Sequence, residues 1–190
     1  MAGSVAKPVE IYQIKVALRG AQPPIWRRIQ VRSDITFANL HSILQSVMGW
    51  DDAHLHQFMI RGEPYGAPDR DPGEPRKAKD ERKHTLSELG AGSGEKFAYT
   101  YDFGDNWEHI LEIEKELPPE EGVRYPLCLA GAGACPPEDV GGIPGYESFL
   151  QALNDPNHPE HDDMLEWIGG SFDPEAFDTT KTNRKLSGLK

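Results

Sequence analysis

The feature of this chain that most constrains its fold is an apolar residue at every second position in five separate segments. Residues 11–18 alternate in this way, and residues 26–31 resume the alternation after a break that contains Gly and Pro. Side chains of a β-strand point alternately to its two faces, so a period of two is typical of strands with one buried face. The short break predicts that the first two segments pair as a β-hairpin.

The longest alternating stretch predicts a second hairpin near the middle of the chain. In residues 95–103 the aromatic residues, including Tyr99, fall on one face, and in residues 107–116 His109 shares a face with apolar side chains. Between the two segments stands Gly104-Asp105-Asn106, whose residues accept the backbone angles of a tight turn. We therefore expect these segments to be adjacent antiparallel strands.

Between the two predicted hairpins the apolar spacing changes from two to three and four. Phe37–Met48 carries apolar residues at the spacing of one helical face. Thr36 can cap the first turn and Gly49 can end the helix. Residues 55–61 then return to alternation, with His56 on the more apolar face, and predict a further strand.

This element order predicts an α+β fold, with a β-grasp-like mixed sheet in the order β-β-α-β-β-β and one covering helix. Residues 146–154 and 161–169 have helical spacing and predict a C-terminal helical extension. At 190 residues, the chain suits one domain over 1–190, with its core at about 9–178. We expect a mobile loop at 62–83 and a flexible basic tail at 179–190, because both are rich in charge and poor in apolar residues.

Charge and composition exclude several classes of function. The net charge of −11 disfavours nucleic acid as a partner, because a protein that neutralises phosphates needs a concentrated positive face. No segment approaches the roughly 20 apolar residues that span a bilayer, and residues 1–8 lack the apolar run of a secretory signal. We therefore expect a cytoplasmic protein with no membrane partner, whose partner is a protein or a small ligand.

Two cysteines and two histidines in the second half form a first candidate metal site. Cys128 and Cys135 are followed by His158 and His161, and four such ligands can hold a tetrahedral zinc ion. The spacings C-x6-C and H-x2-H are looser than those of common zinc sites. The alternative is a pair of ordinary thiols in a Gly-rich loop and two surface histidines.

A second candidate site combines histidines and aspartates on the predicted sheet. His54 and His56 point to the same side of one strand, Asp102 and Asp105 flank the turn of the second hairpin, and His109 lies in the strand that follows. Imidazoles and carboxylates that converge on one pocket can act as general acid and base or hold a catalytic metal. The alternative is that the aspartates only shape the turn and that the histidine on the apolar face is a core residue.

The segment Cys135-Pro136-Pro137-Glu138-Asp139-Val140-Gly141-Gly142 adds two further candidates. Its prolines restrict the backbone, so Glu138 and Asp139 are presented from a stiff loop. Such a loop can supply carboxylates to a site or dock a partner. It can equally be a structural crossover between the sheet and the C-terminal helices.

Several motifs, in order, resemble the plasmid pRiA4b ORF-3-like family. The similar segments are Pro24-Ile25-Trp26-Arg27-Arg28, Leu40-His41, Tyr101-Asp102-Phe103-Gly104-Asp105-Asn106-Trp107-Glu108-His109, the Cys135–Gly142 segment, and the stretches 155–161 and 172–178. The resemblance implies a passenger protein of plasmids or mobile elements and names no reaction.

Together these observations favour a small binding or adaptor module, with a structural metal such as zinc, over an enzyme. No phosphate-binding loop, dinucleotide fingerprint or nucleophile elbow occurs in the sequence. The alternative function is a metal-assisted hydrolase that uses the His/Asp cluster.

Overall fold

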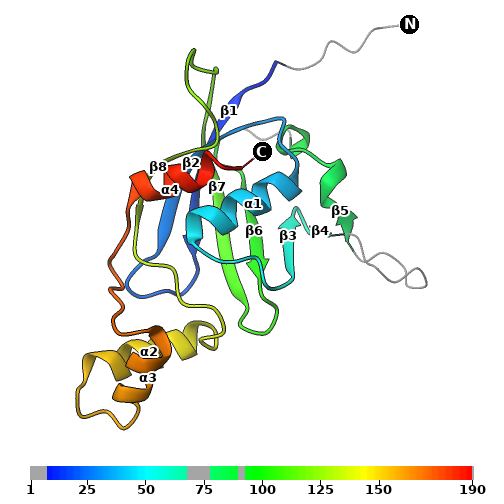
Figure 1. The fold of residues 1–190 in the computed structure, drawn as a ribbon. Coiled ribbons are helices and arrows are strands. Elements are labelled where there is room, and N and C mark those ends of the chain that lie inside the picture. Colours follow the sequence, from blue (N-terminus) through cyan, green and yellow to red (C-terminus); the bar gives the residue numbers. More distant parts are fainter. Residues whose placement is uncertain (1–7, 68–77, 90–92, 190) are drawn as a thin grey trace, which may run out of the picture.

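The computed structural model describes residues 8–67, 78–89 and 93–189, and its centre is one eight-stranded sheet (Figure 1). The strands lie in the order β5-β4-β3-β6-β7-β1-β2-β8. Every neighbouring pair is antiparallel except β4 and β5, which are parallel. The strand bounds are β1 (Ile11–Leu18), β2 (Trp26–Arg32), β3 (His56–Ile60), β4 (Glu63–Gly66), β5 (Lys79–Asp80), β6 (Lys96–Tyr101), β7 (Trp107–Leu117) and β8 (Leu127–Ala132).

The alternation in the sequence decides which strands form the centre of the sheet. β1 pairs with β2 on one side and with β7 on the other, and β6 pairs with both β7 and β3. The two predicted hairpins are therefore confirmed, as is the strand near residue 56. In this register Tyr99 lies opposite His109, and His56 lies opposite Tyr101, so the polar aromatic residues of three strands are neighbours.

Helix α1 (Phe37–Met48) covers the front face of the sheet (Figure 1). The Thr36 hydroxyl accepts a hydrogen bond from Asn39 N at 3.1 Å, and Gly49 ends the helix with a φ of 108°, as the sequence predicts. The buried face of α1 is apolar except for His41 and Gln45. These two polar side chains therefore need partners inside the protein.

The C-terminal third forms three more helices around the sheet. α2 (Gly142–Asn154) and α3 (His161–Ile168) pack on each other at the lower end of the molecule, and α4 (Thr179–Leu186) lies against α1 and β8 (Figure 1). Two short 3-10 helices, η1 (Glu81–Lys83) and η2 (Leu86–Leu89), lie between β5 and β6. Within the described ranges, no helix is long and apolar enough to cross a bilayer.

The prediction of a β-grasp-like sheet with one covering helix is wrong. The sheet has eight strands and is accompanied by four α-helices, of which α4 joins α1 in covering it. The strands that the sequence did not indicate lie toward the two ends of the sheet: β4 and β5 have four and two residues, and the edge strand β8 is rich in small residues. Strands that are very short or built from small residues bury little apolar surface and carry no clear alternation, so their pairing depends on the sheet beside them.

Two segments that were expected to be a mobile loop and a flexible tail contain regular elements. The range 62–83 includes β4, β5 and η1, and its middle, 68–77, lies outside the described residues. The expected tail, 179–190, contains α4, which is capped by the Asp178 carboxylate and buries Thr182 and Leu186. Its polar composition hid the helix, because only two of its residues are buried.

Candidate metal centre

The turn before β3, the start of the β6–β7 turn and the loop after β8 bring four polar side chains together. We call His54, Asp102, Glu138 and Asp139 the open cluster. His54 Nε2 lies 3.1 Å from Asp139 Oδ1 and 3.7 Å from Glu138 Oε2, and His54 Nδ1 lies 3.7 Å from Asp102 Oδ2. A backbone hydrogen bond from Asp102 N to Leu55 O at 2.9 Å joins the two segments that carry His54 and Asp102.

Two polar atoms of the open cluster are buried without a partner. His54 Nε2 and Glu138 Oε2 make no hydrogen bond to any described residue, and the approach of Asp139 Oδ1 to His54 is close but not aligned as one. Unpartnered buried polar atoms are rare, because each loses its hydration on burial. The open cluster therefore has two buried atoms, His54 Nε2 and Glu138 Oε2, that are available to bind a ligand.

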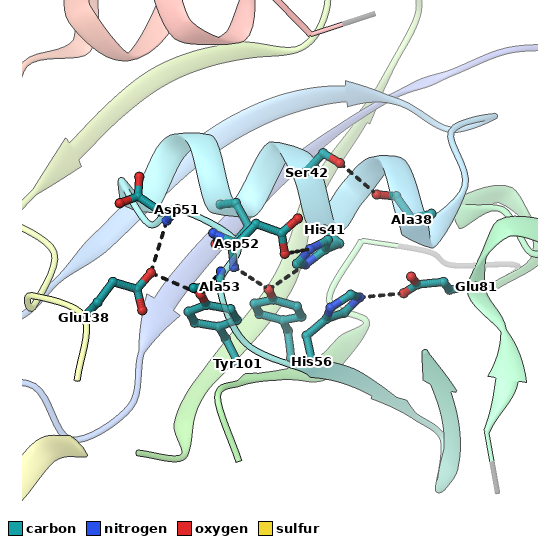
Figure 2. Close-up of polar contacts among 12 residues, drawn as sticks. Ala38, His41, Ser42, Asp51, Asp52, Ala53, His56, Glu81, Tyr101 and Glu138 are labelled. Carbon is teal, nitrogen blue, oxygen red and sulfur yellow. Dashed lines mark hydrogen bonds and ion pairs between the residues drawn. The ribbon is translucent and has the colours of Figure 1, made fainter. Parts of the chain in front are cut away.

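The other oxygen of Glu138 is held firmly, which fixes the direction of the unpartnered one. Glu138 Oε1 accepts hydrogen bonds from Asp51 N at 3.1 Å and from the Tyr101 hydroxyl at 3.0 Å, as Figure 2 shows. Tyr101 in turn accepts a hydrogen bond from Ala53 N. Burial, and then the adjacent Glu138 carboxylate, raise the pKa of Tyr101, so its hydroxyl keeps the proton that it donates.

The backbone around the open cluster is unusually constrained. Asp102 and Asp139 have positive φ values of 53° and 57°, a conformation that residues other than Gly adopt at a cost. The loop is tied down where Gly141 N donates to Asp105 Oδ2 at 3.0 Å and where Trp50 Nε1 donates to Pro136 O at 3.2 Å. Gly142 is required here, because a Cβ atom would lie 2.4 Å from Asp105 O.

A second group of histidines and carboxylates lies further along β3 under α1. We call His41, Asp52, His56 and Glu81 the closed cluster. His41 Nε2 lies 2.8 Å from Asp52 Oδ1, and His56 Nε2 lies 2.8 Å from Glu81 Oε2 (Figure 2). The two imidazole rings stack with centroids 3.4 Å apart and planes 5° apart.

A chain of hydrogen bonds satisfies the closed cluster. Gln45 Nε2 donates to the Tyr99 hydroxyl at 3.0 Å, and that hydroxyl lies 2.8 Å from His41 Nδ1. This order suits a neutral His41 that accepts from Tyr99 and donates to Asp52. Burial, and then the neighbouring His56, lower the pKa of His41, which keeps the ring neutral.

The closed cluster has suitable residue types for a metal but unsuitable geometry. His41, Asp52 and His56 approach one another closely enough to share an ion. However, an imidazole nitrogen binds a metal along a lone pair in the ring plane, and parallel stacked rings direct their lone pairs into separate planes. We therefore interpret this cluster as a structural hydrogen-bond network.

The candidate histidines and carboxylates from the sequence are divided among four places. His54, Asp102, Glu138 and Asp139 meet in the open cluster, whereas His56 joins the closed cluster. Asp105 holds Gly141 N and so supports the loop. His109 does not line a cleft, because it is fully enclosed, with its Nδ1 3.3 Å from Tyr99 O, and burial lowers its pKa to about 4.

The cysteines and later histidines of the first candidate zinc site do not gather. Among the described residues, Cys128, Cys135, His158 and His161 form no group of three ligands. Cys128 Sγ lies near Ala130 O, and His161 Nδ1 lies 2.8 Å from Ala152 O. Burial raises the pKa of both thiols, so both remain protonated.

Sequence reasoning missed His41, Asp52, Glu81 and the roles of Tyr99 and Tyr101. A signal existed for His41, because it lies four residues after Phe37 on the apolar face of the predicted helix. No comparable signal marks Glu81, which follows the residues outside the described ranges and is buried only by the fold. The tyrosines looked like ordinary strand aromatics.

A pocket adjoins the open cluster on the side of α2 and α3. It has a volume of about 260 Å³, and Asp139 forms part of its wall. Most of the remaining wall is apolar and comes from Val140, Phe149, Met164 and Trp167. The open cluster therefore has a cavity beside it.

Comparison with known proteins identifies the relatives of this chain. It is 39% identical over 181 residues to the uncharacterized protein y4hQ of Sinorhizobium fredii, covering 94% of this chain and 92% of that protein. It also resembles the crystal structure of MM3350, a protein of unknown function from Methanosarcina mazei Go1, with 42% identity and a TM-score of 0.81 over 92% of this chain and 98% of that one. Residues 10–181 match the family described as plasmid pRiA4b ORF-3-like protein, and the chain belongs to that family.

Proposed function

We propose that this protein is a binding module that holds one divalent metal ion in the open cluster. His54 Nε2, Glu138 Oε2 and Asp139 Oδ1 would be the ligands, and Asp102 would orient the imidazole through Nδ1. The observation that carries the proposal is the pair of buried, unpartnered atoms, His54 Nε2 and Glu138 Oε2, that face each other at 3.7 Å. A bound cation would satisfy both atoms at once.

The distances in the open cluster suit such an ion. Zinc–nitrogen and zinc–oxygen bonds of about 2.1 Å at tetrahedral angles separate two ligand atoms by about 3.4 Å. The two separations at His54 Nε2, 3.1 Å and 3.7 Å, lie on either side of this value. His54, Asp102 and Asp139 offer ligand atoms that all lie within 4.8 Å of one another, whereas the Glu138 side chain would have to move closer to Asp139 to complete the coordination shell.

The position of Asp102 supports the same assignment. A histidine that binds a metal commonly donates its other ring N–H to a carboxylate, which fixes the tautomer and the ring orientation. Asp102 Oδ2 lies 3.7 Å from His54 Nδ1, while its other oxygen accepts a hydrogen bond from Gly104 N at 2.8 Å. Asp102 is thus anchored on one side and available to His54 on the other.

The ligand types favour zinc or manganese among common metals. One imidazole with two or three carboxylates is a mixed nitrogen and oxygen set, without the thiolates that select softer ions. Three carboxylates beside one imidazole also concentrate negative charge, which a divalent cation would neutralise. A metal held in this way would link β3, the β6–β7 turn and the loop after β8.

Calorimetric titration of the metal-stripped protein with Zn²⁺ and with Mn²⁺ tests the proposal. We expect one equivalent of at least one ion to bind. The variants His54→Ala and Glu138→Gln should each weaken binding by more than about 100-fold, because loss of a ligand exceeds the 10–100-fold effect of an outer partner. Circular dichroism of each variant checks that the fold is retained.

The matched control is His158→Ala, which removes a histidine of the other candidate set. His158 lies outside both clusters and accepts a hydrogen bond from Glu160 N. Its removal should leave metal affinity unchanged. Loss of binding in His158→Ala together with normal binding in His54→Ala would refute the open cluster as the metal centre.

A metal-assisted hydrolase is the second candidate function, and one observation favours it. The Asp139 side chain is 74% exposed and lines the neighbouring pocket, so water or a substrate could reach the ion. Catalytic zinc sites keep such an open position, whereas structural sites are closed by four protein ligands. The same ligands would then serve a reaction.

Hydrolysis of p-nitrophenyl acetate and of bis-p-nitrophenyl phosphate separates the two functions. A hydrolase should accelerate at least one of them only with metal present, and EDTA or His54→Ala should remove the activity. Metal binding without any metal-dependent hydrolysis would support the binding module alone.

A further inference from the structure

The pocket between the loop after β8 and the α2–α3 pair has the chemistry of a site for a cation. Its wall includes two carboxylate residues, Asp139 and Glu160, together with Phe149, Met164 and Trp167. Among the described residues, no Lys, Arg or His lines it. A ligand in this pocket therefore meets negative charge and apolar surface.

Two aromatic rings form a corner in this wall. Phe149 and Trp167 lie with ring centroids 5.6 Å apart and planes at 80°, so the rings meet at almost a right angle. Phe149 is buried against the core, whereas Trp167 is 48% exposed. Phe149 thus gives the corner a rigid side, and Trp167 leaves it accessible from solvent.

Aromatic faces and carboxylates together recognise organic cations. The face of an aromatic ring carries partial negative charge, and an ammonium group close to it is attracted most strongly to Trp. A methylated ammonium also has an apolar surface that it can bury against such rings, as a hydrated metal ion cannot. A carboxylate then supplies the opposite charge at the rim.

We propose that this pocket binds a small organic ammonium ion. Trp167 and Phe149 contact the alkylated cationic head, Glu160 and Asp139 supply the countercharge, and Met164 packs against the carbon chain. The site goes beyond the proposed metal centre and does not require the metal, although Asp139 belongs to both. The pocket therefore gives the protein a second ligand of a different chemical class.

The size of the pocket limits the ligand to a compact one. A closed cavity of about 150 Å³ accommodates benzene. At about 260 Å³, this pocket accommodates a trimethylammonium head with a two-carbon arm, but not a large ring system. Choline is a suitable probe, and 3,3-dimethylbutan-1-ol is its uncharged counterpart of the same shape.

Calorimetry with choline and with the uncharged alcohol tests the proposal on the full chain in EDTA. Choline should bind, and the alcohol should bind about tenfold more weakly or not detectably, because it lacks the cation–aromatic and charge attraction. Trp167→Ala should weaken choline binding by about tenfold, while Trp167→Phe should retain most of it. Equal binding of both probes, or full choline affinity in Trp167→Ala, would overturn the proposal.

A second variant guards against a change in the fold of α3. Glu160→Gln keeps the shape of the side chain and removes only its charge, so choline affinity should fall severalfold while binding of the alcohol stays the same. An unchanged choline affinity in this variant, with the fold intact, would contradict a role for Glu160. Normal metal binding in the same variant would show that the metal centre is separate.

The two sites can fail independently. His54→Ala should abolish metal binding and leave choline binding in EDTA intact, because His54 does not line the pocket. Metal binding without choline binding would refute this inference and leave the proposed function standing. Choline binding without metal binding would support this inference and refute the proposed metal centre.

Discussion

The open and closed clusters contain the same kinds of residue but differ in whether their buried polar atoms have hydrogen-bond partners. The open cluster places one histidine, and the closed cluster two, beside Asp and Glu side chains. In the closed cluster His41 uses both ring nitrogens, and His56 pairs with a buried carboxylate at 2.8 Å. In the open cluster His54 Nε2 and Glu138 Oε2 remain buried without partners.

The difference indicates that residue type alone does not distinguish a structural network from the proposed binding site. The two clusters differ in hydrogen bonding, because a buried polar atom that already has a partner is not available to a ligand. Unpaired buried atoms cost stability unless a ligand compensates them. We therefore expect changes in the closed cluster to alter folding and changes in the open cluster to alter binding.

The largest expected effect is on stability and comes from the closed cluster. His41→Ala should lower the unfolding free energy by about 3 kcal/mol, because it leaves a cavity and removes partners from buried polar groups. His54→Ala in the metal-free protein should change it by less than about 1 kcal/mol, because the lost nitrogen has no partner. Urea unfolding in EDTA measures both free energies. An equal loss of unfolding free energy in the two variants would contradict the distinction between the clusters.

The pH dependence of stability should come from buried neutral histidines. Burial lowers the pKa of His109 to about 4, below the ordinary value of about 6.5 for an unfolded chain. Between these values the unfolded chain takes up a proton that the folded chain refuses, so the unfolding free energy falls by about 1.4 kcal/mol per pH unit as the solution becomes more acidic. His41 acts in the same direction, because burial also lowers its pKa.

Urea unfolding at pH 7, 6 and 5 tests this linkage. His109→Leu should reduce the change of unfolding free energy with pH by the contribution of one proton. His41→Gln should reduce this pH dependence further. A stability that rises toward pH 5, or a slope that neither variant reduces, would contradict the neutral state of these rings.

A smaller effect is expected where Asp102 orients His54. Asp102→Asn keeps the turn and its hydrogen bond from Gly104 N but weakens the partner of His54 Nδ1. Metal affinity should fall about 10–100-fold. Glu81→Gln makes the matched change in the closed cluster and should leave metal affinity unaltered. Calorimetry distinguishes the two, and an equal effect of both would mean that the clusters act as one site.

The smallest effects should come from the two tyrosine hydroxyls of β6. Tyr101→Phe removes one of two hydrogen bonds to Glu138 Oε1 and should weaken metal binding severalfold, with a stability loss of about 1 kcal/mol. Tyr99→Phe removes the partner of His41 Nδ1 and should cost about 1 kcal/mol of stability without changing metal affinity. A change of metal affinity in Tyr99→Phe alone would reverse the assignment of the clusters.

Much of the sheet could be predicted because its central strands carry their own pattern. β1, β2, β6 and β7 alternate clearly, and α1 has both its apolar face and its two end signals. β8 and α4 could not be predicted, because a small-residue edge strand and a polar helix acquire their structure from contacts with β2 and α1. The eight-stranded sheet therefore differs from the expected β-grasp-like one at its edges.

The candidate site was predicted in part for a related reason. His54, Asp102, Glu138 and Asp139 were recognisable as chemical groups beside turns and a stiff loop, where side chains are available for binding. His109 was wrongly grouped with them. The alternation of a strand shows which face a side chain lies on, but not which other residues will cover that face. His109 lies under Trp50 and the core, with the ring of Trp50 5.2 Å away.

By itself the sequence determined the family, the central strands, and α1 and its ends, and it marked a set of candidate metal ligands. These depend on local periodicity and on motifs, which are written along the chain. Only the tertiary structure decided which histidines pair with which carboxylates, and which polar atoms remain unpaired. Those outcomes depend on the register of β3 with β6 and on where the loop after β8 crosses, and contacts between residues 54, 102 and 138 leave no local trace in the sequence.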